Sequence, residues 1–317
     1  MTFAPIILFV YNRPDLAEAT LLSLKQNELA NESELFIYSD GPKGDAGTEQ
    51  LNKIKKVREI IRKENWCAKV NIIEREKNVG LADSVTGGVS EIVNKYGKVI
   101  VVEDDVKLSP FFLRYMNDAL NAYENNERII AIGSWNYFAS DANFHNDHFL
   151  FRYPDSIAWA TYKRSWNLFE HDAKAVYSKL KSKNKLKAFN GDGHAAYFEN
   201  MLQMQIGKKI NSWAIRWTAT AVLHDKLTVL PKTTMSKHMG SGAEATHEKS
   251  EVDYNADLVV SDRKMNITAL TDIKENKMAL EEWTSYVKAN FATEPEQSKT
   301  ICFRVKRKIK SIVKKFL

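Results

Sequence analysis

Short runs of aliphatic and β-branched residues alternate with amphipathic segments through the first 133 residues of this chain. Five runs have the composition of buried strands: 6–10, 35–38, 70–73, 99–102 and 128–132. The segments between them carry apolar residues at helical spacing. Pro14 suits a first helical turn, and Ser109 is the expected N-cap of a helix that Pro110 begins. This alternation predicts an α/β fold with a mostly parallel, Rossmann-like sheet flanked by helices.

Polar residues follow each of the first four predicted strands. They are Asn12 and Arg13, Asp40, Asn78 and Gly80, and finally Glu103, Asp104 and Asp105. In sheets of this kind, ligands bind at the carboxyl ends of the strands. The sequence therefore predicts a binding site at that edge of the sheet.

The carboxylates at 103–105 directly follow a run of four β-branched residues. Adjacent carboxylates repel one another and raise each other's pKa, and each is costly to bury without a partner. A divalent cation removes this penalty, and hard oxygen ligands favour Mg²⁺ or Mn²⁺ over zinc. The alternative is a solvated acidic turn that faces nearby lysines. The position at a strand end, beside other polar loops, favours the metal.

Composition limits the class of protein. With 44% hydrophobic and 27% charged residues over 317 positions, the chain is typical of globular proteins, and no apolar stretch approaches the roughly 18 residues of a membrane span. The N-terminal segment lacks the basic region and cleavage site of a signal peptide, so we expect a strand there. Cys67 and Cys302 are too few for a disulfide framework, which predicts a reducing, cytoplasmic environment.

The formal net charge of +6 resides in the last residues of the chain. Residues 300–317 contain seven lysines and arginines and no acid, and 46 minus seven leaves 39 basic against 40 acidic residues in 1–299. The rest of the chain therefore lacks the basic excess of nucleic-acid-binding proteins, and we expect no nucleic-acid partner.

Within 300–317, apolar residues recur at helical spacing: Ile301, Val305, Ile309, Ile312 and Phe316. This pattern predicts a basic amphipathic helix on an anionic membrane surface. The protein would then be cytoplasmic and peripherally associated with the inner face of the membrane. A disordered solubilising tail and a docking helix for a partner are the alternatives.

After residue 133 the sequence becomes rich in aromatic residues. Aromatic-rich segments expected to be irregular occupy 133–138, 151–166 and 211–217. Regular elements are expected as helices over 193–207 and 213–224, a strand over 227–231, and a helix from about 274 to 290.

The segment VVEDDVKLSPFFLRYMNDAL resembles the metal-binding segment of inverting glycosyltransferases of the GT-A fold, especially the N-acetylglucosaminyltransferase I type. The resemblance continues in order through PIILFVYNR, SDG, GSWN and the segment around Ala158-Trp159. WxxxW and GSGAEATH are similar to bacterial sugar transferases of glycosyltransferase family 2. The resemblance as a whole covers about residues 4–250.

This resemblance implies a metal-dependent, inverting transfer of a sugar from a nucleotide-diphosphate sugar, with uridine diphosphate favoured. The acceptor would be a hydroxyl of a cell-surface glycan precursor or lipid-linked saccharide. It further implies that Asp105 ligates Mn²⁺ or Mg²⁺, that Asp104 lies by the metal or the ribose, and that Glu103 contacts the donor sugar. Asp40 would contact the base, and Arg13 the base or a phosphate.

Bland alternatives exist for two of these residues. Arg13 could form a surface ion pair with Asp15, and Asp40 could simply cap a turn. Asn12, Asn78 and Gly80 are expected on the donor side as well.

In the resembled families an aspartate often follows the first Trp of WxxxW and serves as the general base. This chain has Ala214 there. Asp192 is the leading substitute, with a helix N-cap as its alternative role, and Glu199 and Asp225 are further candidates.

Other residues are expected to contact substrate. Arg216 suits phosphate or carboxylate recognition, or else a buried ion pair. The indoles of Trp135, Trp159 and Trp213 could stack on a sugar, or belong to the core. Asn136 would bind a hydroxyl or stabilise a turn.

The segment 238–247 combines glycines with two histidines. We expect a lid that excludes water from the diphosphate, or else a mobile surface loop. His238 would contact the metal or a phosphate.

Four parts are predicted: a nucleotide-sugar-binding half (1–133), an acceptor and catalytic half (134–250), an extension (251–292), and a linker with the basic tail (293–317). Two other functions stay open. A nucleotidyltransferase would need a glycine-rich basic loop after the first strand, where this chain has VYNRPD. A non-catalytic nucleotide-sugar or carbohydrate-binding protein is compatible with Ala214.

Overall fold

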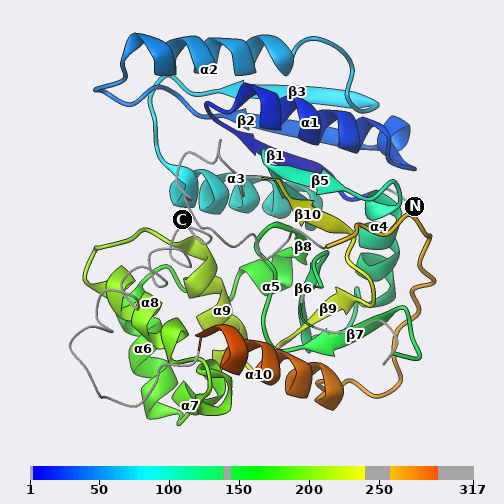
Figure 1. Cartoon of the computed structure of the whole chain (residues 1–317), viewed down its shortest axis with the longest axis vertical. Coiled ribbons are helices and arrows are strands. Elements are labelled where there is room, and N and C mark those ends of the chain that lie inside the picture. Colours follow the sequence, from blue (N-terminus) through cyan, green and yellow to red (C-terminus); the bar gives the residue numbers. More distant parts are fainter. Residues whose placement is uncertain (1–2, 137, 139–143, 240–257, 292–317) are drawn as a thin grey trace.

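The computed structural model describes residues 3–136, 138, 144–239 and 258–291 (Figure 1). Most of the predicted lid loop and the whole basic tail lie outside the described residues. No helix in the described ranges is long and apolar enough to span a membrane.

The first half of the chain alternates strands and helices as predicted. Its elements are β1 (Ile6–Val10), α1 (Pro14–Lys25), the short 3₁₀ helix η1 (Ala30–Glu32), β2 (Glu34–Ser39), α2 (Thr48–Ile60), β3 (Lys69–Glu74), α3 (Leu81–Tyr96), β4 (Lys98–Glu103), β5 (Val106–Leu108), α4 (Phe112–Ala122) and β6 (Ile129–Gly133). Helix α4 begins two residues after Pro110, and Ser109 Oγ accepts a hydrogen bond from the Phe111 amide. The predicted cap thus acts just before the helix rather than at its first turn.

The second half contributes the other strands and a group of helices. Its elements are β7 (His148–Phe151), β8 (Ala158–Tyr162), α5 (Lys163–Trp166), α6 (Ala173–Ser182), α7 (Leu186–Phe189), the 3₁₀ turn η3 (Gly191–Gly193), α8 (Ala196–Ile206), α9 (Trp213–Leu223), β9 (Leu227–Pro231), β10 (Ser236–His238) and α10 (Lys277–Phe291).

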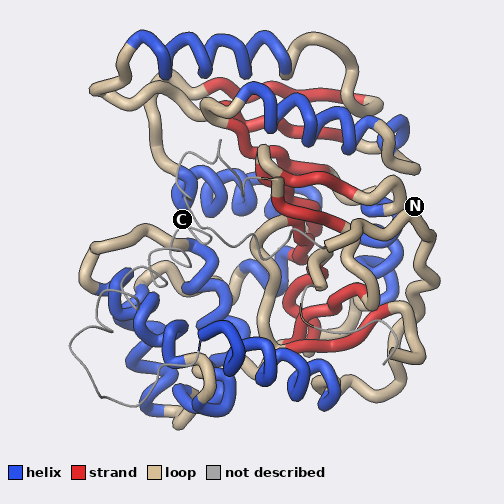
Figure 2. Tube along the Cα trace, in the orientation of Figure 1, coloured by secondary structure: helices blue, strands red, loops and turns tan. Residues whose placement is uncertain are grey.

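Eight strands form one twisted sheet in the order β3-β2-β1-β4-β8-β6-β9-β7 (Figure 2). Only β8 and β7 run against the other six strands. The predicted α/β architecture, with a mostly parallel sheet flanked by helices, is confirmed.

The inner strands are apolar along their whole length because both faces of the sheet are covered. Along β1, Ile6 and Leu8 join the core beneath α1, α2 and α4, whereas Ile7 and Phe9 join the core beneath α3, α5 and α9. Alternate side chains of one strand point to opposite faces, so a strand buried on both sides is apolar throughout.

The prediction of irregular structure over 151–166 is wrong. Strand β8 lies inside the sheet between β4 and β6, so the predicted halves 1–133 and 134–250 share one sheet. Ala158 and Ala160 face one core and Trp159 the other, which is the alternation of a buried strand. An unusually aromatic composition masked this pattern.

Helices α6 to α10 build a separate apolar cluster against β7. At Gly191, φ is +57° and an added Cβ would lie 2.3 Å from the Trp283 ring, so α10 packs directly on this turn. The helix predicted over 274–290 is thus confirmed and closes the helical group (Figure 1).

Candidate functional site

The acidic residues 103–105 form the turn between β4 and β5. Strand β1 pairs in parallel with β4, with Phe9 opposite Glu103. The segment after β1 therefore lies beside the acidic turn, as predicted from the common edge of parallel strands. Asp104 and Asp105 are both buried, with about 3% of each residue exposed.

Arg13 binds two of these carboxylates at once. Its Nη1 lies 2.6 Å from Asp105 Oδ2, and its Nη2 forms an ion pair with Asp104 Oδ1. The alternative pairing of Arg13 with Asp15 is not observed, because Asp15 faces Lys56 at 3.4 Å. The resemblance placed Arg13 on the nucleotide; in this structure its guanidinium neutralises the acidic turn.

His238 reaches the same turn from a distant part of the chain. Strand β10 pairs antiparallel with β5, with His238 opposite Val106. The Met239 amide donates to the Asp105 carbonyl at 2.6 Å, and His238 Nε2 lies 3.0 Å from Asp105 Oδ2. The first residue of the predicted lid loop is thus held at the carboxylate by a short two-stranded sheet.

Burial and charge separate the pKa values of the three acids. Burial raises the pKa of Glu103 well above its ordinary value, and the Asp105 charge adds to this effect. Burial also raises the pKa of Asp104, which Arg13 only partly offsets. For Asp105 burial acts in the same direction, but His238 and Arg13 outweigh it and hold the pKa well below its usual range. Of the three acids, Asp105 is therefore the one whose ionised form its surroundings favour most.

The donor set around Asp105 fits a divalent cation. Asp105 Oδ1 is buried and has no hydrogen-bond partner, which is costly unless a ligand completes it. A carboxylate and an imidazole suit Mn²⁺, and so small a set leaves positions for phosphate oxygens. Within the described ranges no group of three metal-ligating side chains occurs, so bound substrate would have to complete the coordination.

Asp40 organises two loops at the carboxyl ends of β2 and β3. Its carboxylate accepts hydrogen bonds from the amides of Gly41, Val79 and Gly80 at 2.9 to 3.3 Å. Asn78 returns a bond from Nδ2 to the Gly41 carbonyl. Gly80 has φ of +83° at the N-cap of α3, which favours glycine. The bland alternative of capping, extended across two loops, is what the structure shows. Asn12 is half-buried at the end of β1, beside this region.

Asp155 is a fourth buried carboxylate that sequence analysis missed. It accepts hydrogen bonds from the amides of Ser134, Trp135 and Ile157 at 2.9, 3.1 and 2.9 Å. Its charge also raises the pKa of Glu103, after burial and the larger effect of Asp105. Locally, Pro154-Asp155 looks like an ordinary turn, so only the β6–β8 pairing indicates its place.

Asp155 belongs to a polar network that supports β10. Ser134 Oγ bonds the Ala158 carbonyl at 2.6 Å and contacts Ser236 Oγ at 2.5 Å. The Met235 amide donates to the Ser134 carbonyl at 2.7 Å. Because Ser236 begins β10, this network positions the strand that carries His238.

The tryptophans differ in their access to ligand. Trp159 is fully buried and stacks on Trp213 with ring centroids 5.1 Å apart, and Trp213 is 2% exposed. Their faces are covered by the aromatic cluster, which is the arrangement expected for the core role weighed from sequence. Trp135 is half-buried beside Asp155. Asn136 is buried and donates from Nδ2 to the Lys232 carbonyl, as a turn residue does.

Arg216 is buried on the first turn of α9, with 7% exposed. Its guanidinium donates to the carbonyls of Ser212 and His171 and to Asn211 Oδ1. None of these partners is charged, so these contacts do not form the buried ion pair that was the alternative role. Ala214 is 4% exposed in the same aromatic core.

The structure does not bring the predicted general bases to the acidic turn. Asp192 pairs with Arg152 at 3.0 Å. Arg152 follows β7, whose Phe151 lies opposite Thr228 near the start of β9, at the amino end of the parallel strands. Asp192 thus lies at the amino end of the parallel strands, whereas residues 103–105 lie at their carboxyl end. It has φ of +57° in η3 and is not a helix N-cap.

The two further candidates are also engaged elsewhere. Glu199 accepts hydrogen bonds from Tyr177 Oη at 2.8 Å and Asn190 Nδ2 at 2.7 Å, inside the helical group. Asp225 is exposed and pairs with Lys185. The proton acceptor is therefore not identified among the residues that the sequence suggested.

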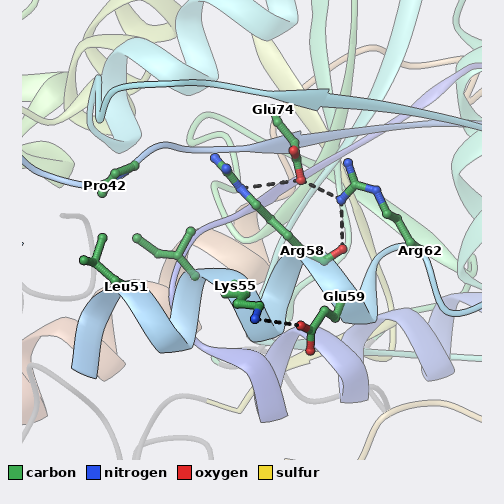
Figure 3. A pocket seen from close by; sticks show the side chains of 8 residues that line it. Pro42, Leu51, Lys55, Arg58, Glu59, Arg62 and Glu74 are labelled. Carbon is green, nitrogen blue, oxygen red and sulfur yellow. Dashed lines mark hydrogen bonds and ion pairs between the residues drawn. The ribbon is translucent and has the colours of Figure 1, made fainter. Parts of the chain in front are cut away.

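A pocket of about 380 Å³ lies away from this chemistry, between α2 and the end of β3 that carries Glu74 (Figure 3). Arg58 and Arg62 both face Glu74 there, at 3.5 and 2.6 Å. The pocket includes none of the carboxylates of the acidic turn.

The fold and the site together define an α/β protein with an acidic cluster at the carboxyl ends of its parallel strands. Residues 90–176 match the model of the GNT-I family, a segment that contains Glu103, Asp104 and Asp105. The resemblance to the N-acetylglucosaminyltransferase I type is confirmed over this segment.

One curated relative is an alpha-1,3-mannosyl-glycoprotein 2-beta-N-acetylglucosaminyltransferase of Arabidopsis thaliana. It is 22% identical over 179 residues, which are 53% of this chain and 39% of the relative. The chain thus spans about two fifths of that protein's length.

Two solved structures are similar at lower identity. A mannosyltransferase from Pyrobaculum calidifontis, in complex with GDP-Man and Mn²⁺, has a TM-score of 0.35 at 12% identity, covering 53% of this chain and 46% of its own. S. aureus TarS 1–349 has a TM-score of 0.37 at 14% identity, covering 76% and 61%.

Proposed function

We propose that this chain is a metal-dependent, inverting glycosyltransferase of the GT-A type, which uses a nucleotide-diphosphate sugar as donor. The observation that carries the proposal is the convergence of Asp105, Arg13 and His238 at one point of the sheet edge. Of these three residues, Asp105 lies in the segment 90–176 that matches the GNT-I family.

The chain's own residues would bind the donor as follows. Asp105 and His238 would hold a divalent cation, which would supply stabilisation of the negative charge on the diphosphate leaving group. Arg13 presents a planar fork of donors that suits a phosphate. Glu103, half-buried and next to Asp105, would contact the donor sugar. Asp40 shapes the loop before α3, which would border the nucleotide.

The substrates follow from the resemblance. A uridine diphosphate sugar is the favoured donor, and a hydroxyl of a cell-surface glycan precursor or lipid-linked saccharide is the acceptor. The basic segment 300–317 would hold the protein on the anionic inner face of the membrane, in the cytoplasm, near such an acceptor.

Nucleotide-sugar binding without turnover is the second candidate. It is favoured by Ala214, which is buried where related enzymes carry their base, and by the engagement of Asp192, Glu199 and Asp225 at other sites. If the chain is an enzyme, a different group must take the proton from the acceptor hydroxyl, for example one of the acids at 103–105 on the donor side.

Release of nucleoside diphosphate from UDP-sugars tests the proposal. We expect release that requires Mn²⁺ or Mg²⁺, stops with a chelator, and falls by roughly 10² or more in Asp105→Asn. Asp272→Asn, an exposed acid that pairs with Lys274 before α10, is the matched control and should behave as wild type. Pyrophosphate release from a nucleoside triphosphate would instead indicate a nucleotidyltransferase. Metal-dependent binding with no turnover on any acceptor would indicate the binding protein.

A further inference from the structure

We propose that Arg13 is a resident counter-ion of the metal site, which leaves Asp104 and Asp105 when the divalent cation enters and then binds the donor diphosphate. This inference rests on the proposed function, since it concerns the same site. It predicts that the affinity for the metal depends on the nucleotide. The protein should bind the metal weakly alone and tightly together with the nucleotide.

The geometry places Arg13 where the cation would be needed. One guanidinium nitrogen binds Asp105 Oδ2 at 2.6 Å, and the other binds Asp104 Oδ1. The carboxylates come from adjacent residues, and the planar fork joins them as a bridging cation would. Without Arg13, two buried carboxylates would repel each other in the empty site, which is costly.

A guanidinium and a divalent cation cannot both occupy this pair of carboxylates. Asp104 Oδ2 already faces the Tyr11 amide at 3.3 Å, and Asp105 Oδ2 is shared by Arg13 and His238. Of the four carboxylate oxygens of Asp104 and Asp105, only the buried Asp105 Oδ1 has no hydrogen-bond partner. A cation bound there would lie close to the guanidinium, and repulsion between the two charges would displace the weaker partner.

Arg13 is the group that can move. Its side chain is 32% exposed, whereas those of Asp104 and Asp105 are 5% and 4% exposed. It directly precedes Pro14 at the start of α1, so the long side chain can turn without displacing a helical residue. A diphosphate bound to the same metal would offer it new anionic partners.

The consequence is a coupling between metal and nucleotide. When the diphosphate takes up the guanidinium, it removes the competitor of the metal, and by reciprocity the metal improves binding of the nucleotide by the same factor. The site would thereby avoid holding a metal ion without substrate.

Calorimetry and Mn²⁺ electron paramagnetic resonance on the full chain test this role without measuring turnover. In Arg13→Gln, the affinity for Mn²⁺ alone should rise roughly tenfold to hundredfold, since two charge-assisted bonds no longer compete. The coupling between Mn²⁺ and UDP should shrink by a similar factor. Arg13→Lys keeps the charge but loses the fork, and should lie between Arg13→Gln and wild type.

Arg62→Gln is the matched control, because Arg62 binds Glu74 beside α2, away from the acidic turn (Figure 3). It removes the same charge and should leave both affinities unchanged. The exchange role is overturned if Arg13→Gln and Arg13→Lys bind Mn²⁺ alone no more tightly than wild type. This conclusion holds whatever the melting temperatures of the two variants, and even where wild type shows Mn²⁺-dependent UDP binding. If wild type binds neither Mn²⁺ nor UDP, the proposed function itself fails.

Discussion

His238 Nε2 lies 3.0 Å from Asp105 Oδ2, although more than a hundred residues separate them in the chain. The contact exists because β10 pairs with β5 immediately after the acidic turn. The hydrogen bond between the buried hydroxyls of Ser134 and Ser236 fixes the start of β10. An imidazole on a strand is thereby held against the carboxylate that is most strongly kept ionised.

Replacing His238 tests this contact. His238→Ala should weaken Mn²⁺ binding, measured calorimetrically in the presence of UDP, by roughly 10- to 100-fold, as the loss of a ligand or of its supporting partner does. His194→Ala is the control, because His194 is exposed in the helical group. Wild-type Mn²⁺ affinity in His238→Ala would exclude the imidazole from the metal site.

The loop clasp at Asp40 should appear as stability. In Asp40→Asn, the amide nitrogen must face at least one backbone N–H, so a buried donor loses its acceptor. We expect the free energy of unfolding, measured in urea, to be lower by about 1–3 kcal/mol than in wild type. Asp45→Asn, in the same loop but exposed, should change it by less than about 0.5 kcal/mol. Equal stability of the two variants would contradict the clasp.

Gly133 is required by close packing at the end of β6. An added Cβ would lie 2.6 Å from Leu230 Cδ2 and 2.7 Å from Asp155 Cβ. Gly133→Ala should therefore destabilise the protein by about 1–3 kcal/mol in chemical denaturation.

The control for this substitution is Gly87→Ala inside α3. Nothing lies within 4 Å of its added Cβ, so it should stabilise the protein by about 0.5–1 kcal/mol. Destabilisation of both variants to the same degree would remove the packing argument at Gly133.

His148 should make stability depend on pH. Burial lowers the pKa of His148 to about 4 from an ordinary 6.5, and its Nε2 lies 2.7 Å from Tyr123 Oη. Below pH 6.5 the unfolded imidazole takes up a proton that the folded one does not accept until about pH 4. This contribution is therefore present above pH 6.5 and lost as pH falls, by about 2 kcal/mol at pH 5.

The measurement compares wild type with His148→Gln in urea at pH 7.5 and pH 5. Other acids titrate in both proteins, so the informative quantity is the difference between them. Wild type should lose about 2 kcal/mol more than the variant. Parallel pH profiles would show that the folded imidazole is protonated normally.

Removal of 300–317 tests the proposed membrane contact. The truncated chain should no longer sediment with anionic liposomes, because seven cations and their apolar face are absent. Neutral phosphatidylcholine vesicles serve as the control, and activity on a soluble acceptor should persist. Undiminished sedimentation of the truncated chain with anionic liposomes would assign membrane binding to another surface.

The alternation of strands and helices, the edge at which ligands bind, and the acidic turn were all predictable from sequence. Each depends on a local pattern: β-branched runs, helical spacing, and polar residues directly after a strand. Glu103, Asp104, Asp105 and Arg13 could be assigned to one edge for that reason. The aromatic segment around Trp159 was the main failure, because its composition concealed an interior strand.

The sequence by itself determined which face and which end of each element is polar, since side-chain direction repeats with the period of a helix or a strand. Only the tertiary structure decided which distant elements meet. It brought His238 to Asp105 and Asp155 to Ser134, buried Trp213, and placed Asp192 at the far edge beside Arg152. The physical reason is that strand order and crossovers minimise the free energy of the whole packed core, and no local period of the chain records them.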